Sequence, residues 1–82
     1  MNNKELEKQF LELVAQYCEI EAADIQPEMR FREDLKFNSL DFMAFLGEVE
    51  DTFDVELDEE KAVTFTTVKE ALDYAEELVE EG

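Results

Sequence analysis

The chain has one serine and one cysteine that could act as nucleophiles, Ser39 and Cys18, and it contains no histidine that could activate either of them. Without an imidazole base we do not expect self-contained hydrolysis, and histidine-based metal sites are excluded. Cys18 follows an apolar helical stripe, where a free cysteine is usually a small hydrophobic residue rather than a reactive thiol. Ser39 precedes a second apolar stripe, and a serine at a helix start commonly caps the backbone.

The other reactive groups are carboxylates, since 24 Asp and Glu stand against seven Lys and Arg, for a net charge of −17. On a solvated acidic surface their pKa values stay near the reference values, so we expect no catalytic acid and base pair. A calcium loop of the EF-hand type needs a central glycine, and neither Gly47 nor Gly82 has that context. The charge repels nucleic acid and anionic lipid, so we expect basic protein partners, with no nucleic acid and no membrane.

The length and the cysteine count limit the organisation of the chain. Its 82 residues suffice for one compact domain spanning residues 1–82, which we expect to be monomeric. A single cysteine cannot form an internal disulfide, so a cytoplasmic setting is expected. Glutamates among the first 20 residues exclude a secretory signal, and no apolar run approaches bilayer length.

Helical periodicity organises the first part of the chain. A capping-box spacing at Asn2 and Glu5 and an apolar stripe predict a helix over residues 3–18. The periodicity then fades from Ile20 to Lys36, which predicts an extended connection held by apolar anchors. The stripe is Leu6, Phe10, Leu13, Val14 and Tyr17, widened by Leu11 and Cys18, and the anchors are Ile25, Met29, Phe31 and Leu35.

The second half predicts three further helices. One begins at Asn38 or Ser39 and ends near Phe53, and a short one follows Asp58 and brings Ala62 and Phe65 to the core. The last begins at a capping box formed by Thr67 and Glu70. Its apolar stripe is Val68, Ala71, Leu72, Ala75, Leu78 and Val79. The fold class is therefore all-α, a small bundle of three longer helices and one short helix with a long loop between helices 1 and 2.

The helix that starts at residue 39 carries two apolar faces. At 100° per residue its core face falls within about 100° of arc, and a second strip lies roughly 140° away, where polar residues are usual. We name this second set, Leu40, Met43, Ala44 and Gly47, the docking strip. The core face is Phe42, Phe45, Leu46, Val49 and Phe53, and the strip is bordered by Asp41, Glu48, Glu50 and Asp51.

An exposed apolar strip with an acidic border is typical of a protein docking site. Gly47 favours this interpretation, because an interior helical glycine costs about 1 kcal/mol and tends to persist where another surface approaches closely. The alternative is that Leu40 and Met43 pack beneath the preceding loop. Both arrangements could coexist.

The segment Asp34-Leu35-Lys36-Phe37-Asn38-Ser39-Leu40-Asp41 resembles the surroundings of the modified serine in acyl carrier proteins. Residues 50–57 are similar to the acidic end of that family's second helix, and residues 65–68 to the start of its last helix. The resemblance covers roughly residues 31–75 and implies an acyl-carrier-like four-helix fold. It also implies that Ser39 receives 4′-phosphopantetheine through a phosphodiester.

In that family the thiol of the arm carries acyl groups as thioesters to fatty acid, polyketide or related biosynthetic enzymes. The resemblance implies a phosphopantetheinyl transferase and acyl synthases or transferases with basic patches as partners, and no catalytic residue in this chain. It also implies an acyl site between helices, and several phenylalanines there would leave little room for long chains. The expected lining is Phe45, Leu46, Val49, Phe53, Leu57 and Phe65.

The rival interpretation is an unmodified acidic adaptor that binds a basic protein through the docking strip. In that case Ser39 would serve only as a helix cap.

Three positions depart from the family pattern: Lys36 replaces a glycine, Asn38 an aspartate, and Ala44 a frequent acidic residue. Losing two carboxylates near Ser39 should weaken recognition by enzymes of a housekeeping fatty acid carrier, so a specialised carrier with its own partners is one hypothesis. Steady-state kinetics with a housekeeping transferase and ketoacyl synthase should give a lower kcat/KM for this chain than for their own carrier. Equal efficiency would contradict the specialisation.

Overall fold

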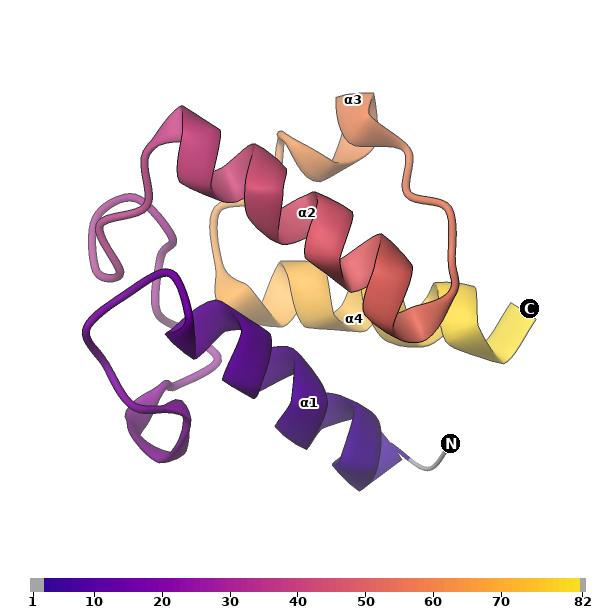
Figure 1. Ribbon diagram of the computed structural model, residues 1–82, viewed down its shortest axis with the longest axis horizontal. Helices are drawn as coiled ribbons and strands as arrows, with labels where there is room; N and C mark the ends of the chain where they lie inside the picture. The colour runs from indigo at the N-terminus through magenta and orange to yellow at the C-terminus, as the bar shows by residue number, and fades with distance from the viewer. Residues whose placement is uncertain (1–2, 82) are drawn as a thin grey trace.

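The protein is an all-helical bundle, as the sequence predicted. The structure is a computed structural model that describes residues 3–81. Within that range it contains α1 (Asn3–Ala15), the 3-10 turn η1 (Ala22–Asp24), α2 (Ser39–Phe53), α3 (Glu59–Ala62) and α4 (Val68–Glu81). α1 contacts both α2 and α4, and Figure 1 shows the long loop gathered at the end of the bundle where α2 begins. Arg30 and Thr67 form an isolated antiparallel bridge.

The first helix ends three residues earlier than predicted. After Ala15 the chain tightens into turns, in which the Gln16 and Tyr17 amides donate to carbonyls three residues back at 3.2 and 3.1 Å. The predicted face is confirmed, because Leu6, Phe10, Leu13 and Val14 are buried and Tyr17 and Cys18 pack partly buried beside them. The helical spacing of apolar residues therefore continues beyond Ala15, where the helix itself ends. The proposed cap at Asn2 lies outside the described residues.

The connection before α2 is held by its predicted anchors, but it is not extended as predicted. It folds into η1 and several turns, and Ile25, Phe31 and Leu35 are buried in it. Backbone hydrogen bonds fasten it to the start of α4, from the Phe31 amide to the Thr66 carbonyl at 2.9 Å and from the Val68 amide to the Met29 carbonyl at 3.0 Å. These bonds satisfy backbone groups that a loop would otherwise bury unpaired.

A reciprocal capping box starts α2 and decides between the two candidate caps. The Asn38 Oδ1 accepts from the Asp41 amide at 2.7 Å, and the Asn38 amide donates to the Asp41 Oδ2 at 3.3 Å. Asn38 is therefore the cap, and Ser39 is the first residue of the helix. α2 ends at Phe53, as predicted, where Asp54 adopts a left-handed conformation with φ of 53°.

The short helix and the last helix also form as predicted. Asp58 caps α3, which buries Ala62 and brings Phe65 partly into the core. The Thr67 hydroxyl accepts from the Glu70 amide at 3.3 Å, and the Thr67 amide donates to the Glu70 carboxylate at 3.2 Å. Hydrogen bonds from the Thr66 amide and hydroxyl, and then from Thr67, lower the pKa of Glu70. On α4, Val68, Ala71, Leu72 and Ala75 are buried, and Leu78 and Val79 are partly buried.

Four phenylalanine rings join the elements around the start of α2. The centroid of the Phe45 ring lies 5.4 Å from that of Phe10 on α1. It lies 5.7 and 5.8 Å from the ring centroids of Phe31 and Phe37 in the loop. All four side chains are buried. Because aromatic contacts of this geometry add to ordinary apolar burial, the cluster holds the loop against α1 and α2.

We predict that Asn38→Ala destabilises the fold by about 1 kcal/mol, because the α2 capping box is lost. For a domain of this size, that change corresponds to a melting temperature lower by about 4–8 °C. Thermal unfolding followed by circular dichroism measures it. Ser39→Ala is the matched control and should have little effect, so an equal loss in the control would show that Asn38 is not the cap.

Candidate functional site

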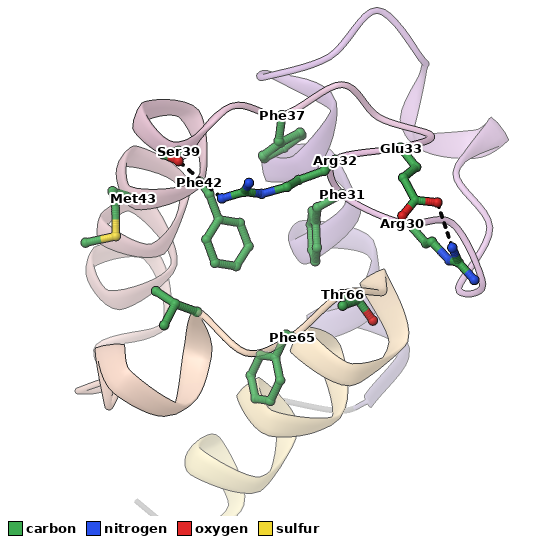
Figure 2. Close-up of a pocket in the computed structure, with 11 residues that line it drawn as sticks. Arg30, Phe31, Arg32, Glu33, Phe37, Ser39, Phe42, Met43, Phe65 and Thr66 are labelled. Carbon is green, nitrogen blue, oxygen red and sulfur yellow. Dashed lines mark hydrogen bonds and ion pairs between the residues drawn. The ribbon is translucent and has the colours of Figure 1, made fainter.

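The Ser39 side chain is exposed at the first position of α2, next to the cap. Its Oγ accepts a hydrogen bond from the Arg32 Nη2 at 3.2 Å, as Figure 2 shows. The expected exposed hydroxyl at a helix tip is confirmed. The interpretation of Ser39 as the helix cap is wrong, because the amide side chain of Asn38 fills that role. The Ser39 hydroxyl is therefore not needed to start the helix.

The docking strip lies on the surface. Leu40 is 81% exposed and Met43 is 42% exposed, while Ala44 is exposed and Gly47 half-buried. The alternative that Leu40 and Met43 pack beneath the preceding loop is therefore wrong for Leu40, whereas Met43 is exposed but also lines a pocket together with residues of that loop. A Cβ atom added at Gly47 would meet nothing within 4 Å, so no contact within the described chain requires a glycine there.

Of the four acidic residues that border the docking strip, two accept backbone hydrogen bonds and two are exposed. Asp41 belongs to the capping box, and the Glu50 Oε2 accepts from the Leu57 amide at 2.9 Å. Glu48 and Asp51 are exposed. The border also affects a neighbouring phenol, since burial, followed by the charges of Glu48 and Asp41, raises the pKa of Tyr17. This face of α2 therefore carries a negative potential beside its apolar strip.

An open pocket of about 240 Å³ lies beside Ser39, between the loop, the start of α2 and the α3–α4 connection. Figure 2 shows the rings of Phe31, Phe42 and Phe65 around it, with the Arg32 side chain reaching across from the loop toward Ser39. Phe31 and Phe42 stack edge-to-face at 5.2 Å between centroids. The pocket is lined by Arg30, Phe31, Arg32, Glu33, Phe37, Ser39, Phe42, Met43, Val63, Phe65 and Thr66.

The predicted acyl-chain lining does not enclose a usable cavity. Phe45, Leu46, Val49, Leu57 and Phe65 surround a space of only about 10 Å³, and Phe53 does not line it. Such a space holds about one water molecule. The packed rings of Phe10 and Phe45 fill this region, so the expectation of little room there is confirmed. Of the six predicted residues, only Phe65 also lines the larger pocket.

Sequence reasoning missed Arg32 as a neighbour of Ser39. The two residues are seven positions apart across an irregular loop, so no helical or strand periodicity links them. It also missed Phe31, Phe42 and Val63 as pocket walls. Phe42 lies in the middle of the predicted core stripe, so its helical phase gave no signal that its ring is only partly buried and borders a pocket.

Neither a metal site nor a membrane-spanning helix is found in the described part of the chain. Between residues 3 and 81, no three His, Cys, Asp or Glu side chains are grouped so that they could hold a metal ion. No helix in this range has the length and apolar character needed to cross a membrane. Cys18 is half-buried, and its Sγ donates to the Ile20 carbonyl at 3.6 Å.

Comparison with known proteins gives a family match over most of the chain. The family model described as "Phosphopantetheine attachment site" matches residues 8–75. A curated acyl carrier protein of Rubrobacter xylanophilus is 36% identical over 77 residues, covering 94% of this chain and 95% of that protein.

Two solved structures of acyl carrier proteins are also similar. The protein of Enterococcus faecalis superposes with a TM-score of 0.81 at 28% identity, covering 95% of this chain and 99% of that one. The protein of Thermotoga maritima superposes with a TM-score of 0.79 at 26% identity, covering 99% and 94% of the two chains.

Proposed function

The chain belongs to the acyl carrier protein family, and from this membership we propose that Ser39 is the residue to which 4′-phosphopantetheine is attached. Ser39 is the only serine in the chain, and it lies within the matched residues 8–75. Its exposed hydroxyl supports the proposal, because a transferase must reach that oxygen. The family acts as a carrier, which agrees with the lack of a histidine base.

The residues around Ser39 fit a phosphodiester. The hydroxyl is exposed, the capping role is filled by Asn38, and the Arg32 guanidinium lies within hydrogen-bonding distance. Guanidinium groups suit phosphate oxygens in charge and in geometry. When bound, the arm supplies a terminal thiol that carries acyl groups as thioesters. The chain itself presents the hydroxyl, while a partner transferase provides the metal, the base and the coenzyme A donor.

We propose that this chain delivers acyl groups to fatty acid, polyketide or related biosynthetic enzymes. The pocket beside Ser39 supports this function, since its walls include Phe31, Phe42 and Val63 and it opens next to the attachment point. Its volume of about 240 Å³ lies below the usual range for small-molecule sites, roughly 300–1,000 Å³. A pocket of this size favours short acyl groups, or only one end of a longer chain.

The docking strip is the surface that we propose for partner enzymes. Leu40 stands 81% exposed one residue after Ser39, with Met43 one helical turn further and the exposed Glu48 and Asp51 nearby. Complementary charge speeds the encounter with a basic partner, and a small apolar contact then sets the register. A carrier must also leave each enzyme, and an exposed strip of this size favours transient binding.

Co-expression with a broad-specificity phosphopantetheinyl transferase should add the mass of one arm to the chain, as measured by intact-mass spectrometry. Ser39→Ala should abolish the gain, and Thr52→Ala, which removes an exposed hydroxyl elsewhere on α2, should retain it. A mass gain that persists in Ser39→Ala would refute the assignment. No gain with any transferase would instead favour the unmodified acidic adaptor.

Leu40→Ala should raise the KM for the transferase several-fold, because the variant loses an exposed apolar contact with the partner. Its urea unfolding midpoint should stay unchanged, since Leu40 is 81% exposed. Leu46→Ala, at 5% exposure, is the contrasting variant and should lose about 2–5 kcal/mol of stability. An unchanged KM for Leu40→Ala would argue against docking at this strip.

A further inference from the structure

We infer that Arg32 binds the phosphodiester at Ser39 and holds the base of the arm on the pocket side of α2. This inference rests on the proposed attachment at Ser39. It concerns which residue of this chain contacts the phosphate, and in which direction the arm then leaves the protein surface.

The first observation is the position of the guanidinium. Arg32 comes from the loop, and its Nη2 lies 3.2 Å from the Ser39 Oγ. In Figure 2 the side chain extends across the pocket toward the start of α2, whereas Arg30 points away to the far side. A phosphorus atom on that Oγ would place its free oxygens one atom beyond the atom that Arg32 already contacts. The contact therefore exists before modification and needs no rearrangement of the loop.

The second observation is that nearby carboxylates are engaged with other groups. The Glu33 Oε2 accepts from the Arg30 Nη1 at 2.6 Å, and the Asp34 Oδ2 accepts from the Arg30 amide at 2.8 Å. Asp41 is held by the Asn38 amide. In residues 3–81, no carboxylate lies within ion-pair distance of Arg32. Arg32 thus reaches a neutral hydroxyl in a chain that has 24 acidic residues.

A neutral hydroxyl is a weak partner for a guanidinium. Arginine presents five N–H donors in a planar fork, while a serine oxygen offers a single acceptor atom. A phosphodiester offers two free oxygens and one negative charge, and charge-assisted hydrogen bonds are roughly twice as strong as neutral ones. Attachment of the arm would therefore strengthen a contact that the unmodified chain makes only weakly.

The contact between Arg32 and the phosphate also sets the direction in which the arm leaves Ser39. Arg32 lines the same pocket as Phe31, Phe42 and Val63, whereas Leu40 stands in solvent. A phosphate held by Arg32 directs the following bonds of the arm toward the pocket. A partner that binds the arm must then compete with Arg32 for the phosphate, and a basic docking patch supplies the charges to do so.

The test uses a chain made by chemical synthesis with an ethyl phosphodiester on the Ser39 hydroxyl and ¹⁵N in Arg32. We expect solvent exchange of the Arg32 guanidinium protons to be slower than in the unmodified chain, by at most about fivefold, the range for exposed charge pairs. The ³¹P resonance of the Arg32 chain should differ from that of Arg32→Gln. About 1 M salt should reduce the difference, because the screening length is then about 3 Å, comparable to the contact itself.

Lys36→Gln is the matched control, since it removes one exposed positive charge from the same loop. Lys36 lines a different hollow, with Tyr17 and Glu19, so the ³¹P resonance should keep its position in this variant. An identical ³¹P resonance with and without Arg32 would overturn the inference. An equal displacement in Lys36→Gln would also overturn it, by showing a general effect of charge.

The synthetic diester separates this inference from the proposed function. It needs no transferase, so a natural chain that gains no arm would refute attachment at Ser39 while the ³¹P comparison still reports on Arg32. Conversely, normal loading of Ser39 together with an unshifted ³¹P resonance would refute the role of Arg32 alone.

Discussion

The packing of Phe45 against rings from other segments is the interaction on which the geometry around Ser39 depends. Phe45 lies on α2 and is fully buried, and its ring contacts Phe10 on α1 and both Phe31 and Phe37 in the loop. The loop is otherwise irregular, and irregular segments are generally more mobile than the helices they connect, so these buried rings help to hold it in one conformation. Since Asn38 and Ser39 directly follow Phe37, the cluster fixes where α2 begins and how the hydroxyl is presented.

The start of α2 separates two tasks that one residue often performs. Asn38 satisfies the first turn of the helix, so the Ser39 hydroxyl can face solvent without a loss of helix stability. Lys36 lies just before this pair with φ of 64°, a left-handed conformation that costs a non-glycine residue about 1–2 kcal/mol. The family pattern has a glycine there. The buried side chains on either side, Leu35 and Phe37, stabilise the turn that Lys36 must make.

The periodicity of apolar residues predicted the helices and their caps. It failed for features whose position is decided by tertiary packing. The bounds of α2, the α3 turn and the Thr67 and Glu70 cap follow from local chemistry that the sequence displays. The end of α1 was missed because Tyr17 and Cys18 keep contact with the core from a turn rather than from a helix. The open pocket was predicted in the wrong place, because the helical phase shows which aromatic rings face the interior. It does not show which space between the packed rings stays open. The Arg32 contact was missed because it spans an irregular loop.

The negative charge of the chain explains why a contact between Arg32 and an attached phosphate would matter. With a net charge of −17, the chain would repel an added phosphate. Burial, and after it the charges of Glu48 and Asp41 on α2, raises the pKa of Tyr17, which follows α1. The Arg32 guanidinium, which has no carboxylate partner among residues 3–81, would offset that repulsion at the place where the phosphate would be attached. A more basic neighbourhood would hold the arm too firmly and would weaken the attraction of basic partners. On an acidic surface, the exposed Arg32 would therefore let an attached arm rest on the pocket and still be withdrawn by a partner of higher positive charge.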